Sequence, residues 1–211
     1  MQLFIDERIE KYAQAHTRAE PKLLIELISK THAETDLPEM LTGRVEGRFL
    51  KLLVQIAQPR LVVEVGMFTG YSALSMAEGL PADGKIITCD IDPDARAIAQ
   101  AAFDASPFGK KIEIRMGPAL ETLRQLDQTI DFAFIDADKV SYPIYYEEIL
   151  KRTRPGGLIL MDNMFLSGRV LDLQDNTAKV VAELNRMLAE DDRVENVLLT
   201  IRDGVQMIRK K

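Results

Sequence analysis

From residue 44 onward, amphipathic helical segments alternate with short apolar runs that are rich in β-branched residues. This alternation is typical of βα units, in which parallel strands form one sheet and helices cover both of its faces. It predicts strands at residues 61–65, 85–89, 111–115, 130–136, 158–162, 194–200 and 205–209. Helices are predicted at residues 44–57, 71–80, 93–105, 118–126, 142–152 and 177–190. A turn at Asp203-Gly204 makes the last two strands an antiparallel hairpin at one edge of a doubly wound, mostly parallel α/β sheet of seven strands.

The first forty residues have a different pattern. Their apolar residues recur at helical spacing and predict two amphipathic helices that end before Leu37-Pro38. These residues are Ile5, Ile9 and Tyr12, followed by Leu23, Leu24, Leu27 and Ile28. The helices could pack on the core, or they could form a lid or a dimer contact, and we favour packing. Because no linker or repeat interrupts the chain, we expect a single domain over 1–211, with a helical segment at 1–40 and a core at 44–211.

Composition excludes several classes of protein. The 211 residues are 46% hydrophobic and 28% charged, and they contain no apolar run that could span a bilayer. The N-terminus lacks the basic and apolar regions of a secretory signal, so we expect a cytoplasmic protein with no membrane partner. A net charge of -6 argues against nucleic acid as a partner, because phosphate binding needs a basic surface. The one cysteine, Cys89, lies in an apolar run and is expected to be a buried thiol.

Ligands of open parallel sheets bind beyond the carboxyl ends of the strands, so the residues that follow each strand are the first candidates for a ligand site. A glycine-bearing turn, Gly66 to Gly70, follows the first strand and is a weak signal for a nucleotide, since the third glycine of GxGxxG is missing. Asp90 ends the second strand, where an acid could accept hydrogen bonds from ribose hydroxyls. We expect Asp92 to cap the next helix and Asp90 to remain free for the ligand. The small residues of Gly117-Pro118-Ala119 could admit a flat base.

Acidic and amide side chains follow the fourth and fifth strands. Asp136 ends one strand, and Asp162-Asn163 ends the next along the chain. Neighbouring strands are about 4.8 Å apart, so these three side chains can converge, and oxygen ligands of this kind suit Mg²⁺ or Ca²⁺. A cation held this way would leave room for both oxygens of a vicinal diol, which points to a catechol. Lys139 could reach the same cleft, where a neighbouring cation would favour its neutral amine as a general base. Taken one at a time, these residues could instead be helix caps and a surface lysine.

Here the sequence resembles the cation-dependent O-methyltransferases typified by caffeoyl-CoA and catechol O-methyltransferases, especially the small bacterial members. The resemblance covers roughly residues 40–209 and implies a Rossmann-like class I methyltransferase fold. It is carried by EVGMFTGYSAL (64–74), LPADGKIITCDID (80–92), FAFIDADKVSYPIYYE (132–147), RPGGLILMDN (154–163) and RDGVQM (202–207).

The resemblance assigns roles to individual positions. It implies that S-adenosylmethionine is the cofactor and that its pocket is lined by Glu64, Gly66, Met67, Ser72, Asp90, Ala119 and Asp136. It implies Asp136, Asp162 and Asn163 as ligands of a divalent cation, with Mg²⁺ expected first and Ca²⁺ or Mn²⁺ as alternatives. Lys139, acting with Asp136, matches the family's catalytic lysine, and Ser167-Gly168-Arg169 matches the turn after the metal motif. Membership would also imply a homodimer.

The sequence departs from the family before the first core helix. Where family members carry a Pro-Glu-Gln-Gly-Gln type of segment, this chain reads Gly43-Arg44-Val45-Glu46-Gly47-Arg48. The helix is expected to persist, and Thr42 falls where the family touches the cofactor and acceptor. The first forty residues carry almost no family signature, so the acceptor itself is not specified.

Together these features favour an S-adenosylmethionine- and metal-dependent O-methyltransferase that acts on a catechol-like small molecule. The metal would orient the diol for direct displacement at the sulfonium methyl, and Lys139 would take the proton. Two alternatives stay open at this point. One is a metal-independent methyltransferase in which Asp136 and Asp162 only cap helices. The other is an NAD-dependent oxidoreductase or a non-catalytic nucleotide-binding module on the same type of fold.

Overall fold

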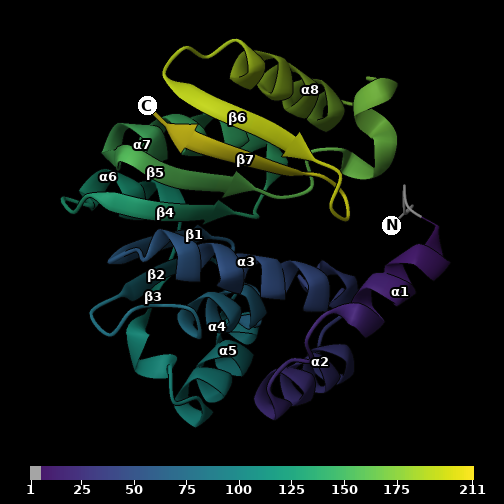
Figure 1. The fold of residues 1–211 in the computed structure, drawn as a ribbon, viewed down its shortest axis with the longest axis vertical. Coiled ribbons are helices and arrows are strands. Elements are labelled where there is room, and N and C mark those ends of the chain that lie inside the picture. The colour runs from purple at the N-terminus through teal and green to yellow at the C-terminus, as the bar shows by residue number, and fades with distance from the viewer. Residues whose placement is uncertain (1–5) are drawn as a thin grey trace.

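The structure, a computed structural model, describes residues 6–211 and is built on one seven-stranded sheet (Figure 1). The strand order is β3-β2-β1-β4-β5-β7-β6. Strands β1 to β5 are parallel, whereas β7 runs antiparallel to both β5 and β6. Their bounds are β1 Leu61–Val65, β2 Lys85–Asp90, β3 Ile112–Met116, β4 Ile130–Ile135, β5 Thr153–Met161, β6 Val194–Leu199 and β7 Val205–Lys210. The predicted fold class is confirmed.

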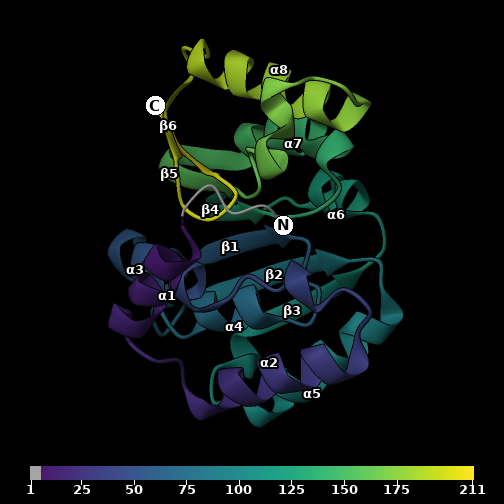
Figure 2. The same cartoon turned by 90° about the vertical axis from the view of Figure 1, so that its right-hand side faces the viewer.

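Helices cover both faces of the sheet (Figure 2). Those of the core are α3 Arg44–Ala57, α4 Tyr71–Ala77, α5 Pro93–Ala105, α6 Ala119–Gln125, α7 Tyr142–Arg152 and α8 Asn176–Ala189. Helices α3 and α4 lie on one face, and α6, α7 and α8 lie on the other. Alternate strand residues supply the two cores, because successive side chains of a strand point to opposite faces. Val63 and Val65 thus face α6 to α8, while Val62 faces α3 and α4.

Most predicted elements lie within a few residues of the observed ones, and two differences are informative. Strand β5 begins at Thr153, five residues before the predicted run at 158, because Pro155 and Gly156 interrupt its apolar pattern. The hairpin turn also lies one residue earlier than Asp203-Gly204. Gly204 N donates to Ile201 O at 2.8 Å, which puts Arg202 and Asp203 at the centre of the turn.

The N-terminal helices behave differently from each other. Helix α2 (Lys22–Glu34) buries Leu24 and Leu27 against the region of α4 and α5, so packing is confirmed there. Helix α1 (Glu7–His16) buries no side chain, and its apolar residues Ile9 and Tyr12 are 58% and 63% exposed. Helix α1 contacts α3 but buries no side chain, so it packs on the domain without joining the core. Ile5, which was assigned to this face, lies outside the described residues.

The sheet topology determines where a ligand can bind. The chain enters the sheet at β1 and moves outward to β3, then returns to the other side of β1 at β4. The loops after β1 and β4 therefore diverge and leave a crevice at their carboxyl ends. Hydrogen bonds extend the parallel pairing past the strands on both sides of this switch, as in Asp136 N to Val65 O at 2.8 Å. Among residues 6–211, no helix is both long and apolar enough to cross a bilayer.

Candidate active site

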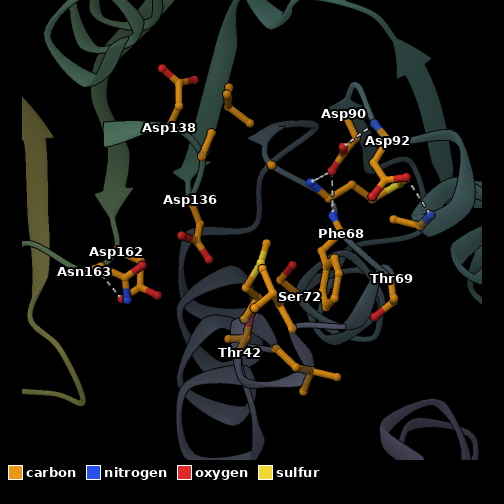
Figure 3. Close-up of a pocket in the computed structure, with 18 of the residues that line it drawn as sticks. Thr42, Phe68, Thr69, Ser72, Asp90, Asp92, Asp136, Asp138, Asp162 and Asn163 are labelled. Carbon is orange, nitrogen blue, oxygen red and sulfur yellow. Dashed lines mark hydrogen bonds between the residues drawn. The ribbon is translucent and has the colours of Figure 1, made fainter. Parts of the chain in front are cut away.

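A cavity of about 1110 Å³ occupies this crevice. Drug-sized ligand sites are usually about 300–1,000 Å³, so it can hold two small molecules side by side. Most predicted site residues line it, namely Thr42, Gly66, Met67, Ser72, Asp90, Ala119, Asp136, Lys139, Asp162 and Asn163. Glu64 does not line it. Asp90 and Asp92 lie at one end, and Asp136, Asp162 and Asn163 gather toward the other (Figure 3).

The turn after β1 brings two strand ends into close contact. Gly66 has φ 95°, and a Cβ atom built on it would lie 1.8 Å from the backbone oxygen of Asp136. Only glycine can occupy this position without displacing Asp136. Phe68, two residues on, is held at φ 48° and lines the cavity. The glycine is thus required by close packing of two strand ends as much as by any ligand.

The Asp90 carboxylate holds this turn in place through hydrogen bonds. One carboxylate oxygen accepts from Met67 N and Phe68 N at 2.9 and 2.7 Å, and the other accepts from Ile91 N and Asp92 N. The expectation of a free Asp90 is therefore wrong, since four backbone N–H groups already use its oxygens. Asp92 does cap α5, as predicted, by accepting from Asp94 N and Ala95 N. Contact between Asp90 and a ribose stays a prediction.

Glu64 lies beneath the cavity wall rather than in it. Its side chain is fully buried, Thr88 Oγ1 donates to Oε2, and Oε1 has no hydrogen-bond partner. Burial raises the pKa of Glu64 to about 8, and the nearby hydroxyl groups of Ser72 and Thr88 offset this only in part. A buried oxygen without a donor is costly, so this position favours a protonated acid or a nearby positive group.

At the other end of the cavity, Asp162 is 1% exposed and Asn163 follows it in a left-handed conformation, with φ 57°. Asn163 N donates to Asp162 Oδ1 at 2.7 Å. The pKa of Asp162 is raised well above its ordinary value by burial and by the negative charges of Glu46 and Asp136. Among residues 6–211, no group of three His, Cys, Asp or Glu side chains forms a metal site. A cation here would therefore need the Asn163 amide as a third ligand.

Two charged residues beside Asp162 were not predicted. Glu46, on the first turn of α3, is fully buried, and its negative charge contributes to the raised pKa of Asp162. Arg202, from the β6–β7 turn, donates to Glu46 Oε2 at 2.6 Å. Helix α3 persists at the predicted bounds, Arg44–Ala57. No local sequence signal distinguishes Glu46 from a surface acid on this helix.

The Lys139 side chain points toward Asp136. Its Nζ donates to Asp136 Oδ1 at 2.9 Å and to the Tyr142 hydroxyl at 2.5 Å. Tyr142 is fully buried and its hydroxyl also lies 3.1 Å from the backbone oxygens of Ile135 and Asp162. Lys139 is thus fixed between two strand ends and is not a surface lysine. Of the nearby aromatic residues, Phe68 and Tyr145 line the cavity, whereas Tyr142 and Tyr146 belong to the core.

The cavity lining is strongly acidic. Three described lining residues are basic: Lys139, Arg169 and Arg202. Ten are acidic: Glu34, Asp36, Glu39, Asp90, Asp92, Asp94, Asp136, Asp138, Asp162 and Asp203. Glu34, Asp36 and Glu39 are exposed at the N-terminal edge, beside the half-exposed Leu37 and Met40.

Comparison with known proteins agrees with this geometry. Residues 14–211 match the O-methyltransferase family. The chain belongs to this family. Probable caffeoyl-CoA O-methyltransferase 1 of Dictyostelium discoideum is 34% identical over 96% of this chain and 91% of its own. Caffeoyl-CoA O-methyltransferase 2 of Zea mays is 38% identical over 81% and 70%. The O-methyltransferase of Bacillus cereus, solved in complex with SAH, aligns with a TM-score of 0.89 at 30% identity and covers 97% of each chain.

Family membership decides between the alternatives for the class of protein. The chain is an S-adenosylmethionine-dependent O-methyltransferase, which sets aside the oxidoreductase and the non-catalytic nucleotide-binding module. TomG of Streptomyces achromogenes, solved in complex with SAM, has the same fold with a TM-score of 0.88 at 27% identity, over 97% of this chain and 96% of its own. The cation and the acceptor are separate questions.

Proposed function

We propose that this O-methyltransferase depends on a divalent cation and methylates one hydroxyl of a catechol-like small molecule. The observation that supports the proposal is that Asp136, Asp162 and Asn163, which follow two adjacent strands, line the same cavity. Lys139 lies in contact with the first of them.

The residues at this end fit a hard cation. Asp162 is buried among negative charges, and Glu46 Oε1 beside it has no hydrogen-bond donor. Carboxylates this close repel one another unless a proton or a cation relieves them. Two carboxylates and an amide oxygen suit Mg²⁺, and they suit Ca²⁺ or Mn²⁺ as alternatives. When bound, the cation supplies positive charge that favours a deprotonated acceptor hydroxyl and open positions for two neighbouring oxygens.

The other end fits S-adenosylmethionine, which supplies the methyl group. Small residues at Gly117 and Ala119 line the cavity there, and a Cβ atom on Gly117 would contact nothing within 4 Å. Phe68 lines the same end and offers a face for a flat base. Together with the cation site, this arrangement holds cofactor and acceptor next to each other in one cavity.

The chain's own residues would orient the reactants and move one proton. Lys139 Nζ lies beside Asp136 and Tyr142, where the acceptor hydroxyls would lie. A cation bound to Asp136 would favour the neutral amine of Lys139, which can then accept the proton released there. No side chain needs to act as a nucleophile, because positioning brings the two substrates into line.

The charge of the cavity favours a particular kind of catechol. The Dictyostelium and maize relatives are named for a coenzyme A thioester, whose phosphates would need cations around them. The exposed edge here carries Glu34, Asp36 and Glu39, next to apolar Leu37 and Met40. An aromatic acceptor without phosphates, either uncharged or cationic, suits this edge better.

We also infer a homodimer, and the exposed apolar residues of α1 and α3 support it. Ile9 and Tyr12 on α1 and Leu52 and Ile56 on the neighbouring α3 are all more than half exposed. Sedimentation or light scattering tests this directly, and a monomer at micromolar concentration would contradict it.

A panel of acceptors tests the function. Vicinal diols and matched phenols with one hydroxyl are incubated with S-adenosylmethionine in the presence of either Mg²⁺ or EDTA. The products are identified by mass spectrometry. We expect methylation of the diols only, lost in EDTA and restored by Mg²⁺. Equal rates on phenols with one hydroxyl, or full turnover in EDTA, would support the metal-independent alternative instead.

A further inference from the structure

Arg202 adopts a backbone conformation that arginine seldom takes. It lies in the turn between β6 and β7 with φ 47°, in the left-handed region that favours glycine. Gly204 in the same turn also has a positive φ, of 88°, but there the residue is a glycine. A non-glycine residue persists in this region only when the contacts around it hold it there.

The contacts of the Arg202 side chain are specific. Nη1 donates to the backbone oxygen of Thr42 and, at 2.6 Å, to Glu46 Oε2. Nη2 donates to the backbone oxygen of Leu41 at 3.4 Å. The side chain is 15% exposed and lines the cavity. One guanidinium therefore ties the β6–β7 turn to the segment that enters α3, which lies far away in the sequence.

The same turn is bonded to the opposite wall of the cavity. Met164 N donates to Gly204 O at 2.9 Å, and Phe165 N donates to Asp203 O at 2.8 Å. Ser167 N donates to Asp203 Oδ1 at 2.7 Å. These three N–H groups belong to the segment that directly follows Asp162-Asn163. The turn therefore joins the wall that carries Thr42 to the wall that carries the proposed cation ligands.

We propose that Arg202 is a positioning residue that sets the separation between Thr42 and the Asp162-Asn163 pair and thereby fixes the tilt of the acceptor ring. This rests on the proposed function, in which both hydroxyls of a catechol lie at the cation end. Which hydroxyl receives the methyl group then depends on the ring orientation, and a displacement of about 1 Å changes reaction rates greatly. Arg202 also balances the buried Glu46 carboxylate beside Asp162.

The test measures the ratio of the two monomethylated products from an unsymmetrical 3,4-dihydroxyphenyl compound. The double variant Arg202→Gly/Glu46→Gln removes the guanidinium without stranding a buried charge, and glycine suits the positive φ. We expect its product ratio to move at least about threefold toward equality and the acceptor KM to rise roughly tenfold, with kcat changing less. Affinity for S-adenosylhomocysteine should stay within about twofold. Arg202→Lys keeps a positive charge opposite Glu46 but lacks the several N–H donors of the guanidinium, so its product ratio should lie between those of wild type and the double variant.

Gln58→Gly is the matched control, because Gln58 is an exposed left-handed residue at φ 48° that lies outside the cavity lining. It should leave the ratio unchanged, and an equal shift there would overturn the proposal. So would a wild-type ratio and KM in the double variant or, if that variant does not fold, in Arg202→Lys. A wild-type enzyme that methylates no catechol would overturn the proposed function as well, whereas an active enzyme with an unchanged ratio overturns only the role of Arg202.

Discussion

The two ends of the cavity are built in opposite ways. At the end near Asp90, both carboxylate oxygens of this residue already accept backbone N–H groups. At the end near Asp162, acidic groups are buried together, and Glu46 Oε1 has no donor. Asp90 therefore has its hydrogen-bond partners before any ligand binds, whereas the acids near Asp162 do not.

This contrast indicates which end should depend on an added charge. Because the turn bonded by Asp90 already has its hydrogen bonds, a ligand adds shape complementarity there but little electrostatic stabilisation. Buried acids whose pKa values are raised by burial and by the negative charge of Asp136 gain a great deal from a cation. Changes at the Asp162 end should therefore act on turnover and metal dependence, while changes near Asp90 should act on cofactor affinity.

The largest effect is expected for Asp162→Ala. Loss of a cation ligand removes several kcal/mol of charge stabilisation, so kcat/KM should fall about a thousandfold, and added Mg²⁺ should not restore it. Isothermal titration should show that S-adenosylhomocysteine still binds within a few-fold of wild type.

Asp138→Asn is the control for this change, because Asp138 lies on the same loop as Asp136 but accepts from Tyr145 and Ser141 instead. Its activity should remain within about threefold of wild type. If Asp162→Ala retained full, EDTA-resistant turnover, the contrast between the two ends would be wrong.

A smaller loss is expected for Lys139→Ala. General bases contribute about 10²–10⁴-fold, so kcat should fall about a hundredfold while cofactor affinity is retained. The residual rate should depend on pH less strongly than that of wild type near neutrality. Lys151→Ala, which removes an exposed ion pair on α7, serves as the control. Wild-type kcat in Lys139→Ala would assign the lysine a structural role.

The sequence predicted the strand ends well because the information is local there. Apolar runs define β1, β2, β4 and β5, so Gly66, Asp90, Asp136 and Asp162 could be placed at their ends. The cap at Asp92 follows from short-range chemistry as well, since an aspartate before a proline is a typical helix start.

The unpredicted features depend on contacts that sequence spacing does not encode. The pairing of Glu46 with Arg202 joins residues 156 positions apart, and no local pattern distinguishes them from surface charges on a helix and in a turn. The bonding of Asp90 depends on how the 66–68 turn folds over β2. For α1, helical spacing identified an apolar face but could not say whether anything covers it.

Glu64 is a further buried acid, and its protonation in the folded state can be tested through the pH dependence of stability. Its pKa is raised to about 8 by burial, so the folded state holds a proton that the unfolded state releases above the ordinary value of 4.5. The free energy of unfolding should therefore fall as pH rises from about 5 to 8, and Glu64→Gln should lack this part of the fall. We expect a difference on the order of 2 kcal/mol, or about 5 °C in Tm for a chain of this length, in the ligand-free protein.

Thermal unfolding of both proteins at several pH values gives the measurement. Glu195→Gln is the control, because Glu195 is largely exposed beside Arg209, and its slope should match that of wild type. Parallel slopes for wild type and Glu64→Gln would mean that Glu64 is ionised in the folded protein at neutral pH.

The smallest effect is expected at the exposed edge, where water and salt weaken charge interactions. Glu39→Lys reverses one charge near Met40 without touching either proposed ligand site. The kcat/KM for a catechol that carries a carboxylate should rise about threefold, and that for a catechol that carries an ammonium group should fall by a similar factor. Both changes should shrink at about 0.5 M salt. Glu190→Lys makes the same change of net charge at the end of α8 and should alter neither substrate, since Glu190 is outside the cavity lining. Equal responses of the two acceptors to Glu39→Lys would show that the acidic edge does not select the acceptor by charge.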